Sequence, residues 1–432
     1  MSAAGNPFCL AGHSTTTADL SITNGKLFNR VLSIISLNHF INDGSTFLIS
    51  SLFPAMQIAL GFSTYNIGIL VALGYVINVV FQPITGRAAQ KFEPGILLPI
   101  GISTMAASMI LFAISTTFAM MVVSIVIMRL GSSFFHPIGA NAISVNYSGS
   151  RLDTAMGIES AFGNLGIVFS FALSAPLYLM FGWSGPFYIY AILQVATVAI
   201  TIPAIGRRLR IDGNSMHEKA GNELQDTGDI VEPHGANTRR KYLLYIPLFF
   251  VVTAFISGGS NSIFGNFGNL LLYHNGFPIS ISNDLIAIWV AFAFLGAVAT
   301  GRLTGLLSRM GVLAVSYLLS GASALGFAVF SGNMLLSAAM LSINGFFLAI
   351  TYPATYSELS DVASLEGTAG PSFGMLFSSQ IIGASIFGYL SGYFSRFFGL
   401  ASIFELASVL LFVSVGIVFI WNLRFRPRLL TQ

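Results

Sequence analysis

Residues 31–59, VLSIISLNHFINDGSTFLISSLFPAMQIA, decide the fold class of this chain. The segment exceeds the roughly 20 mostly apolar residues that cross a bilayer as a helix, yet His39 and Asp43 lie near its middle. An ionised side chain at the bilayer centre costs on the order of 3 kcal/mol. Such side chains therefore occur where they pair with another ionisable group or face a water-filled cavity. Arg129 and Glu159 lie in later apolar segments, and intramembrane charge of this kind indicates a functional site.

The composition is that of an integral membrane protein. Of the 432 residues, 54% are apolar and 8% are charged, whereas soluble domains have about 25% charged residues. The single cysteine, Cys9, excludes a disulfide framework, and we expect neither a metal nor another cofactor. The net charge of +3 does not indicate nucleic-acid binding, because the basic residues cluster in short loops. No Gly-Lys-Ser/Thr phosphate loop and no His-Glu-x-x-His helix occurs, so we expect neither an ATP-driven pump nor an enzyme.

Breaks at Gly, Pro, Asn and charged residues divide the chain into twelve apolar segments. This predicts an all-α integral membrane protein with twelve transmembrane helices in two six-helix, pseudo-symmetric halves. The expected helices cover residues 31–59, 65–85, 95–115, 119–145, 153–180, 185–205, 242–272, 284–306, 312–331, 334–358, 371–395 and 400–423. The expected regions are a disordered cytoplasmic tail (1–28), two helix bundles (29–205 and 242–423), a polar cytoplasmic linker (206–241) and a basic cytoplasmic tail (424–432).

The basic residues at and between the helix ends alternate between the two sides of the predicted bundle. Only one loop of the opposite side, the loop after residues 371–395, has a basic residue, Arg396. By the positive-inside rule, both termini are expected in the cytoplasm of a plasma or inner membrane, and we expect a monomer. The basic positions of the cytoplasmic side are Lys26, Arg30, Arg87, Lys91, Arg151, Arg302 and Arg309, with further ones in residues 206–241 and 424–432.

The two halves also resemble each other in sequence. Residues 40–62 align without a gap on residues 255–277, which places Gly44 over Gly259. In the same order, Phe-His-Pro at 135–137 falls on Thr-Tyr-Pro at 351–353, and Gly166 falls on Gly383. Internal repeats of this kind are typical of secondary transporters.

Two six-helix halves joined by a central cytoplasmic loop resemble the major facilitator superfamily, from about residue 28 to residue 423. Residues 86–91, Gly-Arg-Ala-Ala-Gln-Lys, resemble the family's Gly-x-x-x-Asp-Arg loop, but Gln90 replaces the acid, so the charge relay of that loop is not implied. Arg129-Leu130-Gly131 resembles the family's helix 4 motif, whose Arg lies near the proton-coupling site.

Within the superfamily, three short motifs resemble the fosmidomycin-resistance group of efflux proteins. They are His-Phe-Ile-Asn-Asp at 39–43, Phe-Phe-His-Pro at 134–137 and Gly-Asn-Leu-Gly at 163–166. The resemblance implies a drug/proton antiporter, without establishing which compound is exported.

Asp43 and Arg129 are expected at the same depth, on helices that run in opposite directions. Since both helices line the central cavity of a facilitator fold, the two side chains could meet there. We predict that Asp43 carries the coupling proton, because burial and a nearby guanidinium act in opposite directions on carboxyl protonation. A substrate anion on Arg129 would then release Asp43 to take up a proton. The alternative is a permanent ion pair that locks the two helices together.

Three further groups are candidates for coupling or gating. His39 lies one helical turn before Asp43, where it could join a proton relay or bond a neighbouring helix as a neutral group. Glu159 is expected to pair with Arg151 or to form part of an inner gate, with proton coupling as the alternative. We expect His136 to be a packed polar group at a hinge. The hinge candidates are His136 and the prolines Pro137 and Pro353, which bend helices.

The second half has neutral polar groups where the first has charges. We therefore expect the first half to handle protons while the second contacts neutral parts of the substrate, although interhelical hydrogen bonding explains any single Asn or Ser equally. The predicted function is a proton-coupled exporter of small anionic or amphipathic compounds. Alternatives are a proton-linked importer of an organic anion and, more remotely, a non-transporting membrane sensor. The expected substrate contacts are Arg129, Asn42, Ser260, Asn261, Tyr352, Tyr356 and Gln380.

Overall fold

The computed structural model describes residues 30–89, 92–147, 149–205, 245–364 and 369–425. Within these ranges the secondary structure is helical throughout and contains no strand. The predicted tail 1–28, the predicted linker 206–241 and most of the predicted tail 424–432 lie outside the described residues.

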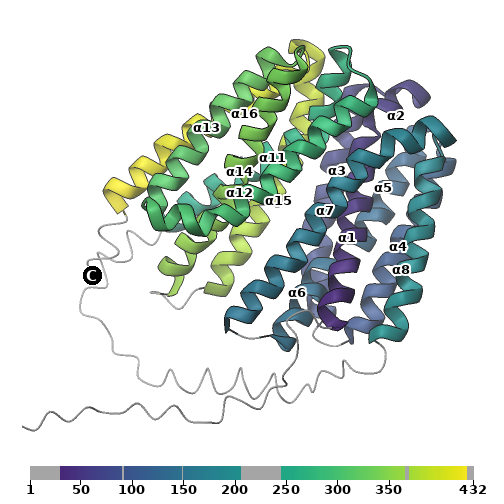
Figure 1. The fold of residues 1–432 in the computed structure, drawn as a ribbon, viewed down its shortest axis with the longest axis horizontal. Coiled ribbons are helices and arrows are strands. Elements are labelled where there is room, and N and C mark those ends of the chain that lie inside the picture. The colour runs from purple at the N-terminus through teal and green to yellow at the C-terminus, as the bar shows by residue number, and fades with distance from the viewer. Residues whose placement is uncertain (1–29, 90–91, 148, 206–244, 365–368, 426–432) are drawn as a thin grey trace, which may run out of the picture.

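The described helices form two groups, one from each half of the sequence, which stand side by side (Figure 1). The first half contains α1 (Arg30–Ser51), α2 (Phe53–Leu60), α3 (Thr64–Ala88), α4 (Pro94–Ile114), α5 (Phe118–Ser132), α6 (Phe135–Asn146), α7 (Gly149–Phe181) and α8 (Gly185–Ile205). The second contains α11 (Tyr245–His274), α12 (Ile279–Leu306), α13 (Arg309–Phe330), α14 (Met334–Ser364), α15 (Ala369–Phe398), α16 (Ser402–Ile420) and a short π-helix, η2 (Trp421–Phe425).

Two of the twelve expected segments are each divided into two helices. The first breaks at Leu52, where Pro54 occupies the first turn of α2. The fourth breaks between α5 and α6, because Pro137 lacks the N–H that would bond the Ser133 carbonyl. The Thr85 hydroxyl donates to that carbonyl instead, at 2.7 Å. In the second half, α14 continues through Pro353.

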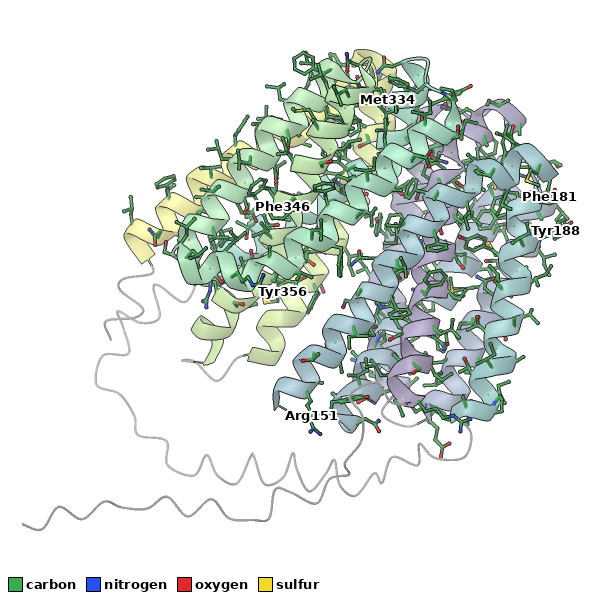
Figure 2. The ribbon with its side chains drawn as sticks, viewed as in Figure 1. Arg151, Phe181, Tyr188, Met334, Phe346 and Tyr356 are labelled. Atoms are coloured by element: carbon green, nitrogen blue, oxygen red, sulfur yellow. The ribbon has the colours of Figure 1, made fainter. Side chains whose placement is uncertain are left out.

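The outer surface is suited to lipid. Ten helices of the described chain are long and apolar enough to cross a membrane. Helices α1 and α15 fall below that hydropathy because they are rich in polar residues and glycines. Large apolar side chains such as Phe181 and Tyr188 project from the outside of the first half, with exposed fractions of 58% and 44% (Figure 2).

Each half begins and ends at the same end of the molecule, which we call the base; the opposite end is the top. At the base, Arg30 donates to the Pro203 carbonyl, which joins the start of α1 to the end of α8. The Trp421 ring stacks on Phe249 at 4.6 Å, which joins the end of α16 to the start of α11. Figure 1 shows the two halves meeting at the top and diverging toward the base.

The contacts between the halves at the top are polar and close. Asn269 donates to the Ser50 and Ser51 carbonyls and to the Asn283 side chain, which in turn donates to Ser174. Beside this network, α3 and α15 approach through glycines. A Cβ added at Gly68 would lie 2.7 Å from the Gly392 Cα.

The internal repeat predicted from the sequence is present as a repeated contact. A Cβ at Gly166 of α7 would collide with the Phe40 carbonyl of α1, and a Cβ at Gly383 of α15 would collide with the Phe255 carbonyl of α11. The sequence alignment pairs these same positions. The same close approach of two helices therefore builds the core of each half, as expected for a pseudo-symmetric fold.

Candidate functional site

His39 is the centre of a row of ionisable groups inside the first half. Its Nε2 lies 3.0 Å from the Asp43 carboxylate, and its Nδ1 lies 2.7 Å from the Glu159 carboxylate of α7. We call Glu159, His39 and Asp43 the carboxylate–imidazole array. A neutral imidazole has only one N–H, so both contacts become hydrogen bonds only if the array holds two protons between its nitrogens and oxygens. Loss of one of these protons would leave a lone pair of a His39 nitrogen facing a lone pair of a carboxylate oxygen. The arrangement of the array is thereby tied to its protonation.

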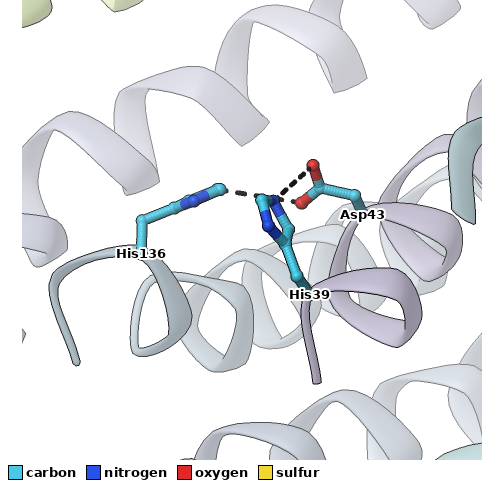
Figure 3. A group of neighbouring side chains, drawn as sticks. All are labelled: His39, Asp43 and His136. Atoms are coloured by element: carbon cyan, nitrogen blue, oxygen red, sulfur yellow. Dashed lines mark hydrogen bonds and ion pairs between the residues drawn. The ribbon is translucent and has the colours of Figure 1, made fainter. Parts of the chain in front are cut away.

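Asp43 has two further neighbours. The Asn42 amide donates to Asp43 Oδ1 at 2.9 Å, and His136 Nε2 lies 3.7 Å from the same oxygen. Figure 3 shows the His136 ring on α6 pointing toward His39 and Asp43 on α1. The array and His136 together thus form a row from a buried carboxylate on α7 to a histidine on α6.

A glycine on α7 makes the array possible. A Cβ at Gly163 would lie within 2.7 Å of three atoms of the His39 ring. Only glycine leaves room for the ring while α7 remains close enough for Glu159 to reach Nδ1. Gly163 belongs to the Gly-Asn-Leu-Gly motif of the sequence, but its role as the space for His39 was not predicted.

The expected meeting of Asp43 and Arg129 does not occur. Among the described residues, no carboxylate lies within 4 Å of the Arg129 guanidinium, and Arg129 Nε has no hydrogen-bond partner. Arg129 is only 7% exposed and lies over the Tyr75 ring, with Cζ 5.2 Å from the ring centroid. Gly74 leaves the space that this side chain fills, since a Cβ there would lie 2.9 Å from Nε. Arg129 still interacts electrostatically with Asp43, at longer range.

Two other expectations about the first half are wrong, and a third stays a prediction. Glu159 bonds His39 and not Arg151, which is exposed and lies at the base (Figure 2). His136 is not a packed group, because 47% of its side chain is exposed. Asn42 is 1% exposed and its amide donates to Asp43, and its contact with substrate stays a prediction.

The second half contributes a neutral, aromatic group of residues. The Tyr356 hydroxyl donates to Gln380 at 3.1 Å, and the Tyr352 hydroxyl donates to the Ser257 carbonyl at 3.1 Å. The rings of Tyr352 and Tyr356 lie 6.5 Å apart, edge to face. Tyr75, beneath Arg129, is close enough to Tyr352 for the two phenolic groups to interact electrostatically. The first half therefore approaches the tyrosines of the second half through Tyr75.

Two candidate substrate contacts of α11 differ in exposure. Ser260 is fully buried and its hydroxyl has no partner among the described residues, whereas Asn261 is partly exposed. In this conformation Ser260 is therefore covered. Tyr75 was not predicted as a site residue; its place directly after Gly74 in the sequence was the only signal available.

His39, Asp43 and His136 are also the one group of described residues whose ligand atoms, within 4.8 Å of one another, could hold a metal ion. Both nitrogens of His39 already face carboxylates, so a metal would have to displace a contact of the array.

Comparisons with known proteins agree with this architecture. A family model described as Major Facilitator Superfamily matches residues 35–370. The chain is 25% identical over 403 residues to the Fosmidomycin resistance protein of Escherichia coli (strain K12), covering 91% of this chain and 93% of that protein.

Two solved structures share the fold. The nucleoside transporter NupG superposes with a TM-score of 0.69 at 16% identity, over 90% of this chain and 98% of that one. A bacterial homolog of the human lysosomal transporter Spinster, inward-facing and occupied, superposes with a TM-score of 0.73 at 14% identity, over 92% and 97%. The predicted fold and the expected absence of an enzyme are confirmed: this chain belongs to the major facilitator superfamily and is a multi-pass membrane transporter.

Proposed function

We propose that this transporter exports small anionic or amphipathic compounds in exchange for protons, by alternating access between the two sides of a plasma or inner membrane. The observation that carries the proposal is the buried Arg129, which has no carboxylate partner among the described residues and lies beside the array. An unpaired buried cation is costly, and an anionic substrate would remove that cost.

The geometry supports a division of labour between the halves. A guanidinium offers a planar fork that holds a carboxylate or a phosphonate through two bonds. The array holds the exchangeable protons, and Tyr352, Tyr356 and Gln380 supply aromatic faces and neutral hydrogen bonds to the rest of the substrate. Export is supported by the likeness to a protein whose name denotes drug resistance.

The proposed orientation has both termini in the cytoplasm, from the distribution of basic residues. The base would then be the cytoplasmic end, and the conformation described here, with the halves in contact at the top, would load substrate from the cytoplasm.

A second candidate is a proton-linked importer of an organic anion. An anion on Arg129 would weaken the attraction that the guanidinium exerts on Asp43, so that anion and proton would bind together. Joint binding favours co-transport, whereas exchange requires that substrate and proton occupy the transporter in different half-cycles.

The test is transport in proteoliposomes under an imposed pH gradient of either sign, with a panel of organic anions. Export by exchange predicts that substrate moves against the proton flow, and co-transport predicts that it moves with it. Asp43→Asn should abolish gradient-driven transport but retain substrate exchange, because Asn keeps the shape and cannot ionise. A normal dependence of Asp43→Asn on the gradient would overturn the coupling role.

Substrate affinity, measured without a gradient, tests Arg129. Arg129→Lys should weaken binding nearly as much as Arg129→Ala, because Lys supplies a point charge without the fork. Arg151→Ala, which removes an exposed cation at the base, is the matched control and should bind normally. Unchanged affinity in Arg129→Ala would remove this residue from the substrate site.

A further inference from the structure

His136 differs from the groups of the array in its exposure. The side chains of His39, Glu159 and Asp43 are 8%, 10% and 19% exposed, whereas that of His136 is 47% exposed. It lies in the first turn of α6, a helix at the base where the two halves diverge (Figure 1). The row of ionisable groups therefore ends in one that the protein leaves half exposed.

The fold holds the His136 ring in place. Its edge meets the His39 ring at a centroid distance of 5.3 Å and the Phe135 ring at 5.4 Å. Pro137 follows directly, and Thr85 satisfies the carbonyl that this proline leaves free. The break between α5 and α6 thus turns the imidazole toward Asp43.

The charged and titratable groups that interact with His136 come from three elements. Asp43 and His39 lie on α1, Glu159 on α7 and Arg129 on α5. Asp43 is the nearest acceptor, with its Oδ1 3.7 Å from His136 Nε2. That distance is slightly too long for a hydrogen bond, and either a small ring rotation or one bridging water would close it.

We propose that His136 is the proton shuttle between solvent and Asp43, an inference that rests on the proposed proton coupling. In the forward step, the N–H bond at Nε2 of the protonated ring breaks and an O–H bond forms at Asp43 Oδ1, which leaves His136 neutral with its proton on Nδ1. A hydronium ion in the water that reaches the ring then protonates Nε2: one O–H bond of the hydronium breaks, the N–H bond at Nε2 forms again, and a water molecule is left. Imidazole is the one side chain whose unperturbed charge change falls between about pH 5 and 8, which suits it to relaying protons.

The test separates proton-driven transport from substrate exchange in the same proteoliposomes. His136→Ala should retain exchange and lower gradient-driven transport by on the order of 100-fold, the usual contribution of one acid–base group. His136→Gln should be equally slow, because an amide keeps a polar contact but cannot carry a proton. Wild-type rates and an unchanged pH profile in either variant would overturn the proposal.

Chemical rescue distinguishes a shuttle from a structural role. Added imidazole should restore gradient-driven transport in His136→Ala, and a series of methylimidazoles should change the restored rate in step with their basicity. His39→Ala, whose site is buried, should not be rescued. If His136→Ala loses exchange as well and imidazole restores neither activity, the residue is structural. If the His136 variants behave as wild type but Asp43→Asn has lost its dependence on the pH gradient, the shuttle is refuted and the proposed function stands. If Asp43→Asn keeps a normal dependence on the gradient, both proposals are refuted.

Discussion

Replacing Gly163 by alanine should disrupt the array although it leaves every ionisable residue in the sequence unchanged. The new Cβ would lie 2.7 Å from Cδ2 and Cε1 of His39, whereas ordinary contact begins at 3.4 Å. The Nε2 of the ring is closer still, so the ring must withdraw by about 1 Å. A shift of that size lengthens the 2.7 Å contact with Glu159 or the 3.0 Å contact with Asp43 beyond hydrogen-bonding distance. Overpacking of this kind costs about 1–3 kcal/mol.

The assay combines a denaturation equilibrium in detergent with gradient-driven transport in proteoliposomes. Gly163→Ala should lower the free energy of unfolding by about 1–3 kcal/mol and uncouple transport. Gly157→Ala on the same helix is the control, because nothing lies within 4 Å of its Cβ, and it should behave as wild type. In the His39→Ala background the cost of Gly163→Ala should fall by about 0.5–3 kcal/mol. Equal costs in both backgrounds would refute the steric argument.

Two further predictions concern the top contacts and the orientation. Asn269→Ala removes the hydrogen bonds to the Ser50 and Ser51 carbonyls of the other half and the bond to Asn283 in its own half, each worth roughly 0.6 kcal/mol. The change should shift the equilibrium away from the conformation that is closed at the top. The readout is faster thiol labelling of a cysteine placed at Ser174; an unchanged labelling rate would show that the network does not hold the top closed. In a Cys9→Ser background, a membrane-impermeant thiol reagent applied to intact cells should label a cysteine at Asn333 but not at Ser215, and the reverse pattern would overturn the topology.

The interior contacts of each half show why some side-chain neighbours were predictable and others were not. His39 and Asp43 are four residues apart on one helix, so their contact follows from helical geometry alone. The depth of Arg129 in the membrane could also be calculated from the helical rise per residue, but the direction in which its side chain points could not. The space beside Gly74 lets the guanidinium lie over Tyr75. The sequence around Arg129 does not show which helix, or which glycine of that helix, will pack against it.

The sequence by itself determined the membrane class, the all-helical fold, the repeated halves and the presence of a charged site in the first half. These follow from the length of apolar segments, from the cost of intramembrane charge and from aligned glycines, all of which are local properties. Only the tertiary structure decided that Glu159 and His136 join His39 and Asp43 while Arg129 stays apart. The reason is that helix rotation and separation are set by packing between segments, here by the glycine contacts of α7 with α1 and of α3 with α5.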